Sequence, residues 1–184
     1  MQTKDWRLYE VYLLHIHDVI RVSGENLGPY FGKSGLAIGI MKTLKKHLNQ
    51  RNRDLILEMV KELLTKRCSV TLRQDIHKFI SSELANGKTS SERIIFIYFC
   101  QNIASSISKK YFAESFLETY VSLLAVERNQ SVIFAMIKTA EDLRPLLEEA
   151  SHISKLEGLL TTWKADKKKC RYIQEVYNNI INFL

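Results

Sequence analysis

Apolar side chains recur along most of this chain every three or four residues, the spacing that places them on one face of an α-helix. The pattern is clearest in residues 111–147, where two apolar stripes flank the short polar segment 127–130. The stripes contain Phe116, Leu117, Tyr120, Val121 and Leu124, then Val132, Met136, Ile137, Ala140 and Leu143. They predict two antiparallel helices joined by a tight turn, with Asn129 as the N-cap of the second.

The same spacing predicts seven further helices, at about residues 5–23, 35–48, 53–66, 70–85, 90–107, 151–164 and 171–184. In the first of them we expect a buried stripe of Trp6, Tyr9, Leu13, Ile16 and Ile20, widened by Val11, Leu14 and Val19. The helix at 90–107 is apolar on nearly every side from Ile94 to Cys100, which predicts burial between neighbours. Asn86-Gly87 is a helix stop signal, and Thr89 with Glu92 forms a capping box that opens the next helix.

Every second predicted helix begins about 40 residues after the one before it. With Arg7, Arg53, Arg93, Ile133 and Arg171 as equivalent early positions, the intervals are 46, 40, 40 and 38 residues. The Gly-rich segment 24–35 accounts for the longer first interval. Two helices per repeat at this period are typical of a HEAT-type α-solenoid. We therefore expect one all-α solenoid over residues 1–184, with about 4.5 repeats at residues 5–49, 50–88, 89–128, 129–166 and 167–184.

Composition agrees with a helical protein, since the chain has only 7 Gly and 2 Pro, and 46% of its residues are hydrophobic. Cys68, Cys100 and Cys170 are too few and too scattered for a disulfide framework. The N-terminus has no signal-peptide pattern, and no apolar run approaches the roughly 18 residues that span a bilayer. These features predict a cytoplasmic protein without membrane insertion, with the nucleus as the alternative compartment.

The chain carries a formal net charge of +7, concentrated in its first half. Lys and Arg outnumber Asp and Glu by 15 to 9 in residues 1–90 and by 12 to 11 in residues 91–184. A basic surface favours acidic proteins, anionic membranes or nucleic acid, although many proteins with no such role are equally basic. The candidate partner-binding residues flank the turns within repeats: Lys66, Arg67, Arg73, Lys109 and Lys110. An alternative basic ridge follows the turns between repeats: Arg51, Arg53, Lys88, Arg128, Lys167, Lys168 and Lys169.

Residues with catalytic chemistry do not form a recognisable constellation. His15 and His17 share one predicted helix but point about 200° apart, so they cannot bind one metal ion together. His47, His77 and His152 are isolated in the sequence, and adjacent carboxylates such as Glu148 and Glu149 diverge on a helix. The Gly-rich segment 24–35 lacks the lysine-serine pair of a phosphate-binding loop. We expect neither enzyme activity nor a cofactor nor a metal site.

Three segments match a known repeat pattern: Asp5-Trp6-Arg7, the segment that starts with Lys110-Tyr111-Phe112, and residues 129–140, which begin Asn129-Gln130-Ser131-Val132. They resemble HEAT repeats of the scaffold subunit of serine/threonine phosphatase 2A and of related phosphatase 4 regulatory subunits. The resemblance implies that turns within repeats hold catalytic and regulatory subunits. Ile133 stands where the family usually has Arg, and Ile137 where Ala is usual, which predicts a gap in the polar ladder between repeats.

Together these features predict a non-enzymatic protein-binding scaffold or regulatory subunit, whose partner is a protein such as a serine/threonine phosphatase catalytic subunit. Two alternatives remain open. One is a HEAT protein that binds nucleic acid or ribonucleoprotein through its basic ridges, with an affinity that falls steeply with salt. The other is an adaptor for transport or for the assembly of large complexes, in which aromatic anchors dominate binding.

Overall fold

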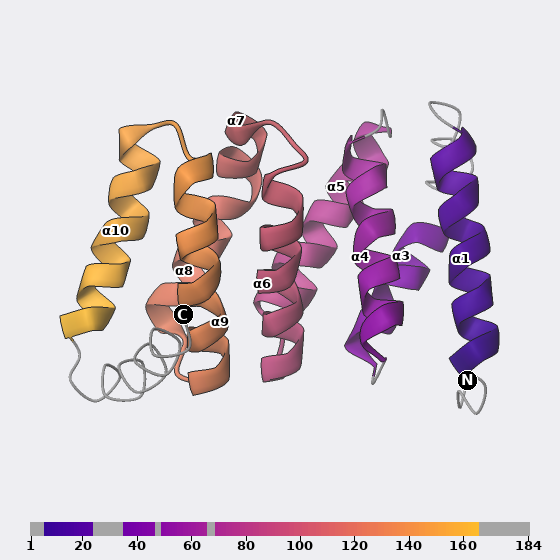
Figure 1. Cartoon of the computed structure of the whole chain (residues 1–184), viewed down its shortest axis with the longest axis horizontal. Helices are drawn as coiled ribbons and strands as arrows, with labels where there is room; N and C mark the ends of the chain where they lie inside the picture. The colour runs from indigo at the N-terminus through magenta and orange to yellow at the C-terminus, as the bar shows by residue number, and fades with distance from the viewer. Residues whose placement is uncertain (1–5, 24–34, 47–48, 66–68, 166–184) are drawn as a thin grey trace, which may run out of the picture. The chain divides into compact units, whose positions relative to one another are not determined.

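The structure is a computed structural model that describes residues 6–23, 35–46, 49–65 and 69–165. The helices of these residues are, in chain order, α1 (Trp6–Ser23), α3 (Leu36–Lys42), α4 (Gln50–Thr65), α5 (Val70–Lys78), α6 (Ser90–Ala104), α7 (Lys109–Phe112), α8 (Glu118–Val126), α9 (Gln130–Leu143) and α10 (Ala150–Ala165) (Figure 1). Short 3-10 turns extend two of them: η2 (Thr43–Lys45) follows α3, and η5 (Arg144–Leu146) follows α9. Two wider π-helical segments also occur: η3 (Phe79–Ala85) continues α5, and η4 (Ala113–Leu117) joins α7 to α8.

The prediction of an all-α fold is confirmed for the described residues. Counting α5 with η3 as one helix, and α7, η4 and α8 as another, they contain eight helices that match eight of the nine predicted ones. The ninth, at residues 171–184, lies outside the described residues. The helix predicted to reach residue 48 ends as an α-helix at Lys42, where the Thr43 hydroxyl donates to the carbonyl of Ile40 at 2.6 Å. A Ser or Thr side chain that bonds the backbone in this way competes with the helical pattern.

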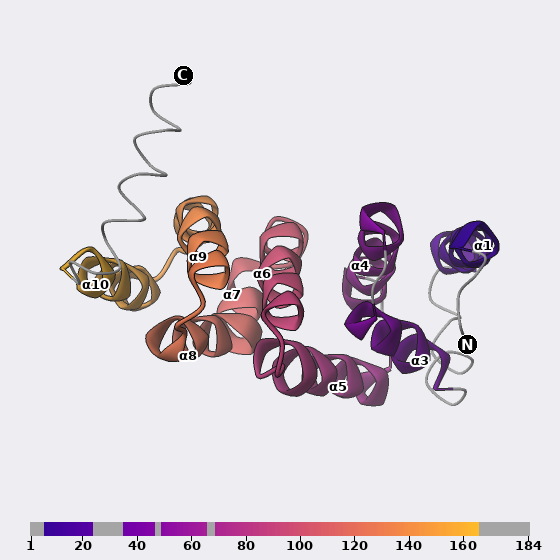
Figure 2. The ribbon, with the colours of Figure 1, turned by 90° about the horizontal axis from the view of Figure 1, so that it is seen from below.

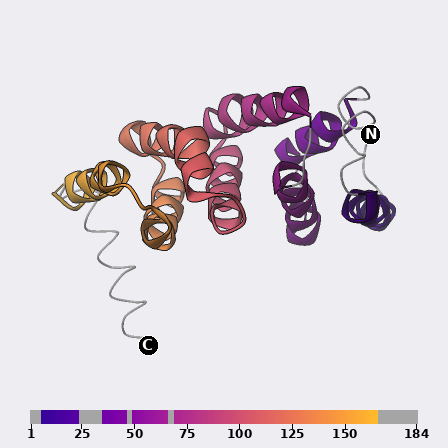
Figure 3. The ribbon, with the colours of Figure 1, turned by 90° about the horizontal axis from the view of Figure 1, so that it is seen from above.

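The chain forms two compact units, residues 1–107 and residues 108–184, and each is described by itself. In the first unit α1 packs against α4, and α6 packs against both α4 and η3. The views from below and from above show α4 and α6 in one layer and α3 and α5 in a second (Figures 2 and 3). The core between these helices consists of apolar side chains that include Leu13, Ile20, Met41, Leu44, Ile56, Met59, Leu72, Ile76 and Phe96.

In the second unit, α8 packs against α10 and is tied to α9 by a buried hydrogen bond. The Tyr120 hydroxyl donates this bond to the carbonyl of Met136. The predicted tight turn between these helices is confirmed, because the Asn129 side chain accepts hydrogen bonds from the backbone N–H groups of Ser131 at 3.1 Å and Val132 at 3.3 Å. The core is rich in aromatic side chains and contains Phe112, Phe116, Tyr120, Leu124, Met136, Ala140 and Leu143.

Three helices begin at caps spaced evenly along the sequence. Asn49 accepts the N–H of Asn52 at the start of α4, Thr89 caps α6, and Asn129 caps α9. Their residue numbers, 49, 89 and 129, differ by 40 and 40. Arg53, Arg93 and Ile133, chosen from the sequence as equivalent, are therefore each the fourth residue after a cap.

The face that α1 buries is narrower than the sequence pattern predicts. Leu13, Ile16 and Ile20 are buried as expected, but Trp6, Val11 and Val19 are about half exposed. Only one side of α1 packs against α4, and the two valines lie on another side, so they do not widen the buried stripe.

Candidate protein-interaction surfaces

The predicted cluster of basic residues at turns within repeats is only partly described. Lys66 and Arg67 lie outside the described residues, and Arg73 is in α5 of the first unit. Lys109 and Lys110 are the first two residues of α7 in the second unit, where the Ser108 side chain caps the helix. Each of these lysines faces a carboxylate: Lys109 Nζ lies 2.9 Å from Glu148 Oε1, and Lys110 Nζ lies 3.8 Å from Glu114 Oε1. Part of their charge is therefore already compensated.

The alternative basic ridge includes one residue that joins two helices. Arg51 Nε lies 2.6 Å from Glu10 Oε1, and Glu10 is buried, so this ion pair ties α4 to α1. Arg53 donates from Nη2 to Gln50 Oε1 at 2.8 Å. Lys88 and Arg128 are exposed in the turns before α6 and α9. The last three members, Lys167, Lys168 and Lys169, lie outside the described residues.

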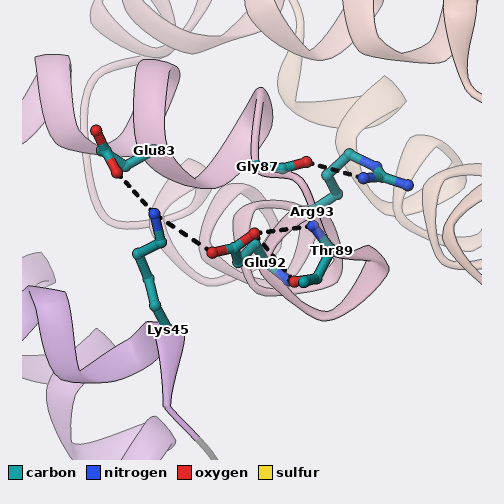
Figure 4. Close-up of polar contacts among 6 residues, drawn as sticks. All are labelled: Lys45, Glu83, Gly87, Thr89, Glu92 and Arg93. Atoms are coloured by element: carbon teal, nitrogen blue, oxygen red, sulfur yellow. Dashed lines mark hydrogen bonds and ion pairs between the residues drawn. The ribbon is translucent and has the colours of Figure 1, made fainter.

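Sequence patterns identified the Thr89–Glu92 part, but not the remainder, of a polar network in the first unit (Figure 4). Lys45, the last residue of η2, places its Nζ 2.7 Å from Glu83 Oε2 of η3 and 3.3 Å from Glu92 Oε1 of α6. We call Lys45, Glu83, Thr89 and Glu92 the junction cluster. It connects three helical segments at the turn that contains Lys88.

The capping box predicted at Thr89 and Glu92 is confirmed within this cluster. Glu92 Oε2 accepts from the backbone N–H of Thr89 at 2.9 Å and from its hydroxyl at 3.0 Å, while Thr89 Oγ1 accepts the N–H of Glu92 at 3.2 Å. Arg93 closes the same turn, because its Nη1 donates to the carbonyl of Gly87 at 2.8 Å. These bonds satisfy donors at the start of α6 that have no partner inside the helix.

Charges in the junction cluster stabilise one another. Burial raises the pKa of the Glu92 carboxyl, but hydrogen bonds from Thr89 and Lys45 outweigh it, so the net shift is downward. The hydrogen bond to Lys45 lowers the pKa of Glu83, and the same bond raises the pKa of Lys45. All three groups are thus charged near neutral pH, so the cluster is suited to holding helices together rather than to proton transfer.

A groove of about 360 Å³ lies between α4 and α6 in the first unit. Its lining combines polar and apolar side chains: Gln50, Arg53, Asp54, Leu57, Ile94, Ile95, Tyr98 and Asn102. A smaller hollow of about 80 Å³ adjoins it and shares Asp54, Leu57 and Asn102 while adding Glu58 and Lys61. We call the two together the α4–α6 groove. It follows residues 50–61 of α4 and residues 94–102 of α6.

The groove has an apolar floor and polar rims. Leu57 and Ile95 of the floor are buried, whereas Tyr98 is almost half exposed. Asn102 Nδ2 donates to the carbonyl of Tyr98 at 2.8 Å, and no donor from the described residues reaches the Asn102 side-chain oxygen. On the opposite rim Gln50 Nε2 donates to Asp54 Oδ1 at 2.7 Å, which orders that wall. An apolar centre with a polar rim is the usual anatomy of a protein-binding surface.

Sequence reasoning selected Arg53 of this groove and missed Tyr98 and Asn102. The run from Ile94 to Cys100 was expected to be buried throughout, and most of it is, but Tyr98 points outward. A hydroxyl-bearing residue within an otherwise apolar run was the available signal, since Tyr is suited to sites that are apolar at one end and wet at the other.

A larger hollow of about 630 Å³ lies on the other layer of the first unit, between α3 and the helix formed by α5 and η3. Charged and polar side chains dominate its lining, which consists of Ile38, Lys42, Asp75, Lys78, Phe79, Ser82 and Glu83. Phe79 is buried beneath it, and Glu83 already binds Lys45. Its aromatic side chain is thus not exposed, whereas the α4–α6 groove presents the exposed ring of Tyr98.

Reactive groups are few in the part of the chain that the structure describes. Within it, no three His, Cys, Asp or Glu side chains come close enough together to hold a metal ion. Cys100 is fully buried in α6, and burial raises the pKa of its thiol well above the usual value. None of the described helices combines the length and the apolar character needed to span a bilayer. Comparisons with protein-family models, with curated proteins and with solved structures found no match to this chain.

Proposed function

We propose that this chain is a non-enzymatic protein-binding scaffold and that its α4–α6 groove holds an extended segment of a partner protein. The observation that supports this most directly is the exposed ring of Tyr98 beside an apolar floor and an Asn102 side-chain oxygen that can accept a hydrogen bond. Tyr is enriched among the residues that contribute most to protein binding.

The dimensions of the groove suit a short extended segment. Residues 50–61 of α4 rise by about 16 Å, since an α-helix rises 1.5 Å per residue. An extended chain covers that distance with about five residues at roughly 3.3 Å each. Apolar side chains of such a segment would lie over Leu57 and Ile95, and one of its backbone N–H groups would donate to Asn102.

Charge pairing favours a protein partner over a nucleic acid. In the groove, Lys61 Nζ donates to Glu58 Oε1 at 2.6 Å, and the lining residues Arg53 and Asp54 carry opposite charges, so that the rim is close to neutral. Outside the groove, Arg51, Lys109 and Lys110 each face a carboxylate. Nucleic-acid binding depends on Lys and Arg side chains that replace the counterions of the phosphates. Side chains already paired with carboxylates contribute less to this binding.

HEAT-type repeats remain our proposal for the architecture, and the helix caps at residues 49, 89 and 129 support it. Under this proposal the partner class is the one that the resemblance implies, a serine/threonine phosphatase catalytic subunit. The scaffold would act as a regulatory subunit that positions this enzyme and performs no chemistry itself.

The test is affinity purification from the source cell, followed by mapping of the partner segment. Wild-type chain, Tyr98→Ala and Asn102→Ala are compared, with Val126→Ala as the control because Val126 is an exposed residue of α8 that does not line the groove. We expect the recovered protein to yield one short segment whose binding weakens about 30-fold for Tyr98→Ala, as for a residue worth about 2 kcal/mol. The Val126→Ala chain should bind like wild type.

Two results would contradict the proposal. Equal binding of the partner by the folded wild-type, Tyr98→Ala and Asn102→Ala chains would show that the groove is not the binding site. Recovery of nucleic acid, lost on nuclease treatment and strongly weakened by salt, would favour the basic ridges instead. Recovery of a protein other than a phosphatase subunit would retain the scaffold and exclude the phosphatase assignment.

A further inference from the structure

Helix α1 has two apolar faces, and among the described residues only one of them is covered. Leu13, Ile16 and Ile20 are buried, and α1 packs against α4. A second set of side chains lies elsewhere on the helix and is exposed: Leu8 (66%), Tyr12 (45%), Val19 (51%) and Val22 (80%), with exposed His15 between them. We call Leu8, Tyr12, His15, Val19 and Val22 the outer stripe. At about 100° per residue, the outer stripe is roughly 120° around the helix from the buried face.

The spacing of the outer stripe is that of a helix–helix interface. Its members follow one another at steps of four, three, four and three residues, the repeat that keeps apolar side chains on one seam between two packed helices. The seam extends over 15 residues, about 21 Å along the axis of α1. An exposed row of this length on one helix indicates an interaction surface rather than scattered surface residues.

The outer stripe is complementary to itself in an antiparallel arrangement. Leu8 and Val22 each lie seven residues from His15, and Tyr12 and Val19 lie three and four residues from it. The large side chains are in the first half of the stripe and the small ones in the second. A second copy turned antiparallel about His15 therefore places Leu8 against Val22 and Tyr12 against Val19, so that large and small side chains alternate as close packing requires. A parallel copy would instead oppose Tyr12 to Tyr12 and Val22 to Val22.

We propose that two copies of this chain associate through their α1 helices, antiparallel and two-fold symmetric about His15. Burial of the outer stripe on both copies removes on the order of 1,000 Å² from water, at the lower limit of specific interfaces, so the dimer is weak and depends on concentration. Antiparallel packing also brings the N-terminal end of each helix dipole next to the C-terminal end of the other. The interface uses a different element from the α4–α6 groove, so the two proposals stand independently.

The first experiment measures the mass of the full chain by sedimentation equilibrium over a wide range of concentration. Wild type should shift from monomer to dimer, and Val22→Glu should remain monomeric where wild type is dimeric, with at least a tenfold weaker association. The matched control is Val126→Glu, because Val126 is a valine of comparable exposure (73%); this variant should leave the dimer intact. His15→Leu places an apolar side chain at the two-fold axis and should strengthen association about tenfold or more.

The second experiment establishes the orientation by disulfide trapping under mild oxidation, with wild type as the blank because it contains three cysteines of its own. His15→Cys should cross-link to itself. Val22→Cys should cross-link to Leu8→Cys in a mixture and not to itself. A wild-type chain that stays monomeric at every concentration, or a dimer unaffected by Val22→Glu, would overturn the proposal. Self-cross-linking of Val22→Cys would overturn the antiparallel arrangement.

Discussion

Lys45 Nζ lies 3.3 Å from Glu92 Oε1, while the other oxygen of the same carboxylate accepts two hydrogen bonds from Thr89 at the start of α6. One side chain thus takes part both in a local helix cap and in a contact with a residue 47 positions earlier in the sequence. The start of α6 is therefore fixed by its own sequence and, at the same time, by Lys45 of η2, which comes before α4 and α5 in the chain.

Removing the cap should destabilise the first unit. Thr89→Ala deletes the hydroxyl that accepts the N–H of Glu92 and donates to its carboxylate. Loss of such a cap costs about 1 kcal/mol of unfolding free energy. Thr71→Ala, at an exposed helical position in α5, is the control and should change stability by less than about 0.5 kcal/mol. Urea unfolding of the two variants tests this, and equal stabilities would mean that the cap contributes nothing.

The junction cluster should make stability depend on pH in acid. Because the pKa of Glu92 in the folded chain lies below its usual value of 4.5, the folded state binds this proton less readily than the unfolded state does. The resulting stabilisation is complete above pH 4.5 and is lost as the pH falls through the folded-state pKa. In Glu92→Gln this contribution is absent, so its unfolding free energy should fall less steeply between neutral and acidic pH. Parallel curves for the two chains would contradict the assignment.

Alkaline pH should weaken the same cluster through deprotonation of Lys45. The hydrogen bond to Glu83 raises the pKa of Lys45 above its usual 10.5, so this contribution is present below pH 10.5 and is lost as the pH rises through the folded-state value. Lys45→Gln should therefore lose less stability than wild type above pH 10.5, as followed by helical circular dichroism. A steeper alkaline loss in Lys45→Gln than in wild type would be the opposite of what the contacts predict.

Gly87 should tolerate no side chain, in contrast to a second glycine of the same unit. A Cβ at Gly87 would lie 2.5 Å from Glu92 Cβ and 2.9 Å from the carbonyl oxygen of Leu84, so Gly87→Ala must displace the turn before α6. We expect it to destabilise the chain by roughly 1–3 kcal/mol. Gly39 is helical with nothing within 4 Å of its added Cβ, and Gly39→Ala should stabilise by up to about 1 kcal/mol. Thermal unfolding of both variants gives the comparison, and a shift of the same sign in both would exclude this explanation.

In the second unit, the buried hydroxyl of Tyr120 should contribute measurably to stability. Tyr120→Phe removes its hydrogen bond to the carbonyl of Met136 with little change in shape, at a cost of about 1 kcal/mol. Tyr98→Phe is the matched control. Because Tyr98 is exposed, removal of its hydroxyl should leave the unfolding free energy nearly unchanged. Chemical unfolding monitored by fluorescence would separate the two, and an unchanged midpoint for Tyr120→Phe would show that water replaces the bond without loss.

Features that depend on residues three or four apart could be predicted from the sequence. The capping box of Thr89 and Glu92, the Asn129 cap and the stop at Asn86-Gly87 are all present, because each involves a side chain and a backbone group within one helical turn. The buried stripes of α8 and α9 were predicted for the same reason, with Tyr120, Leu124, Met136 and Leu143 in the core.

Features that depend on distant partners could not be predicted in this way. Lys109 contacts Glu148, which is 39 positions later in the sequence, and Lys45 contacts Glu83, which is 38 positions later. The sequence around each lysine therefore does not indicate its partner. The outward positions of Val11 and Val19 were missed because an apolar residue adds to a helical pattern whichever neighbour it faces. Tyr98 was missed for the same reason, although it contributes the main exposed ring of the α4–α6 groove.

The equal spacing of Asn49, Thr89 and Asn129 has a consequence for how such a chain can lengthen or shorten. Removal of residues 50–89 would place Asn49 directly before Ser90, and α6 would still begin with a capping side chain. Insertion of a second copy of the same 40 residues would likewise end at Thr89 and open the next helix correctly. Duplication or loss of this segment during gene recombination therefore leaves every new junction with a proper helix start.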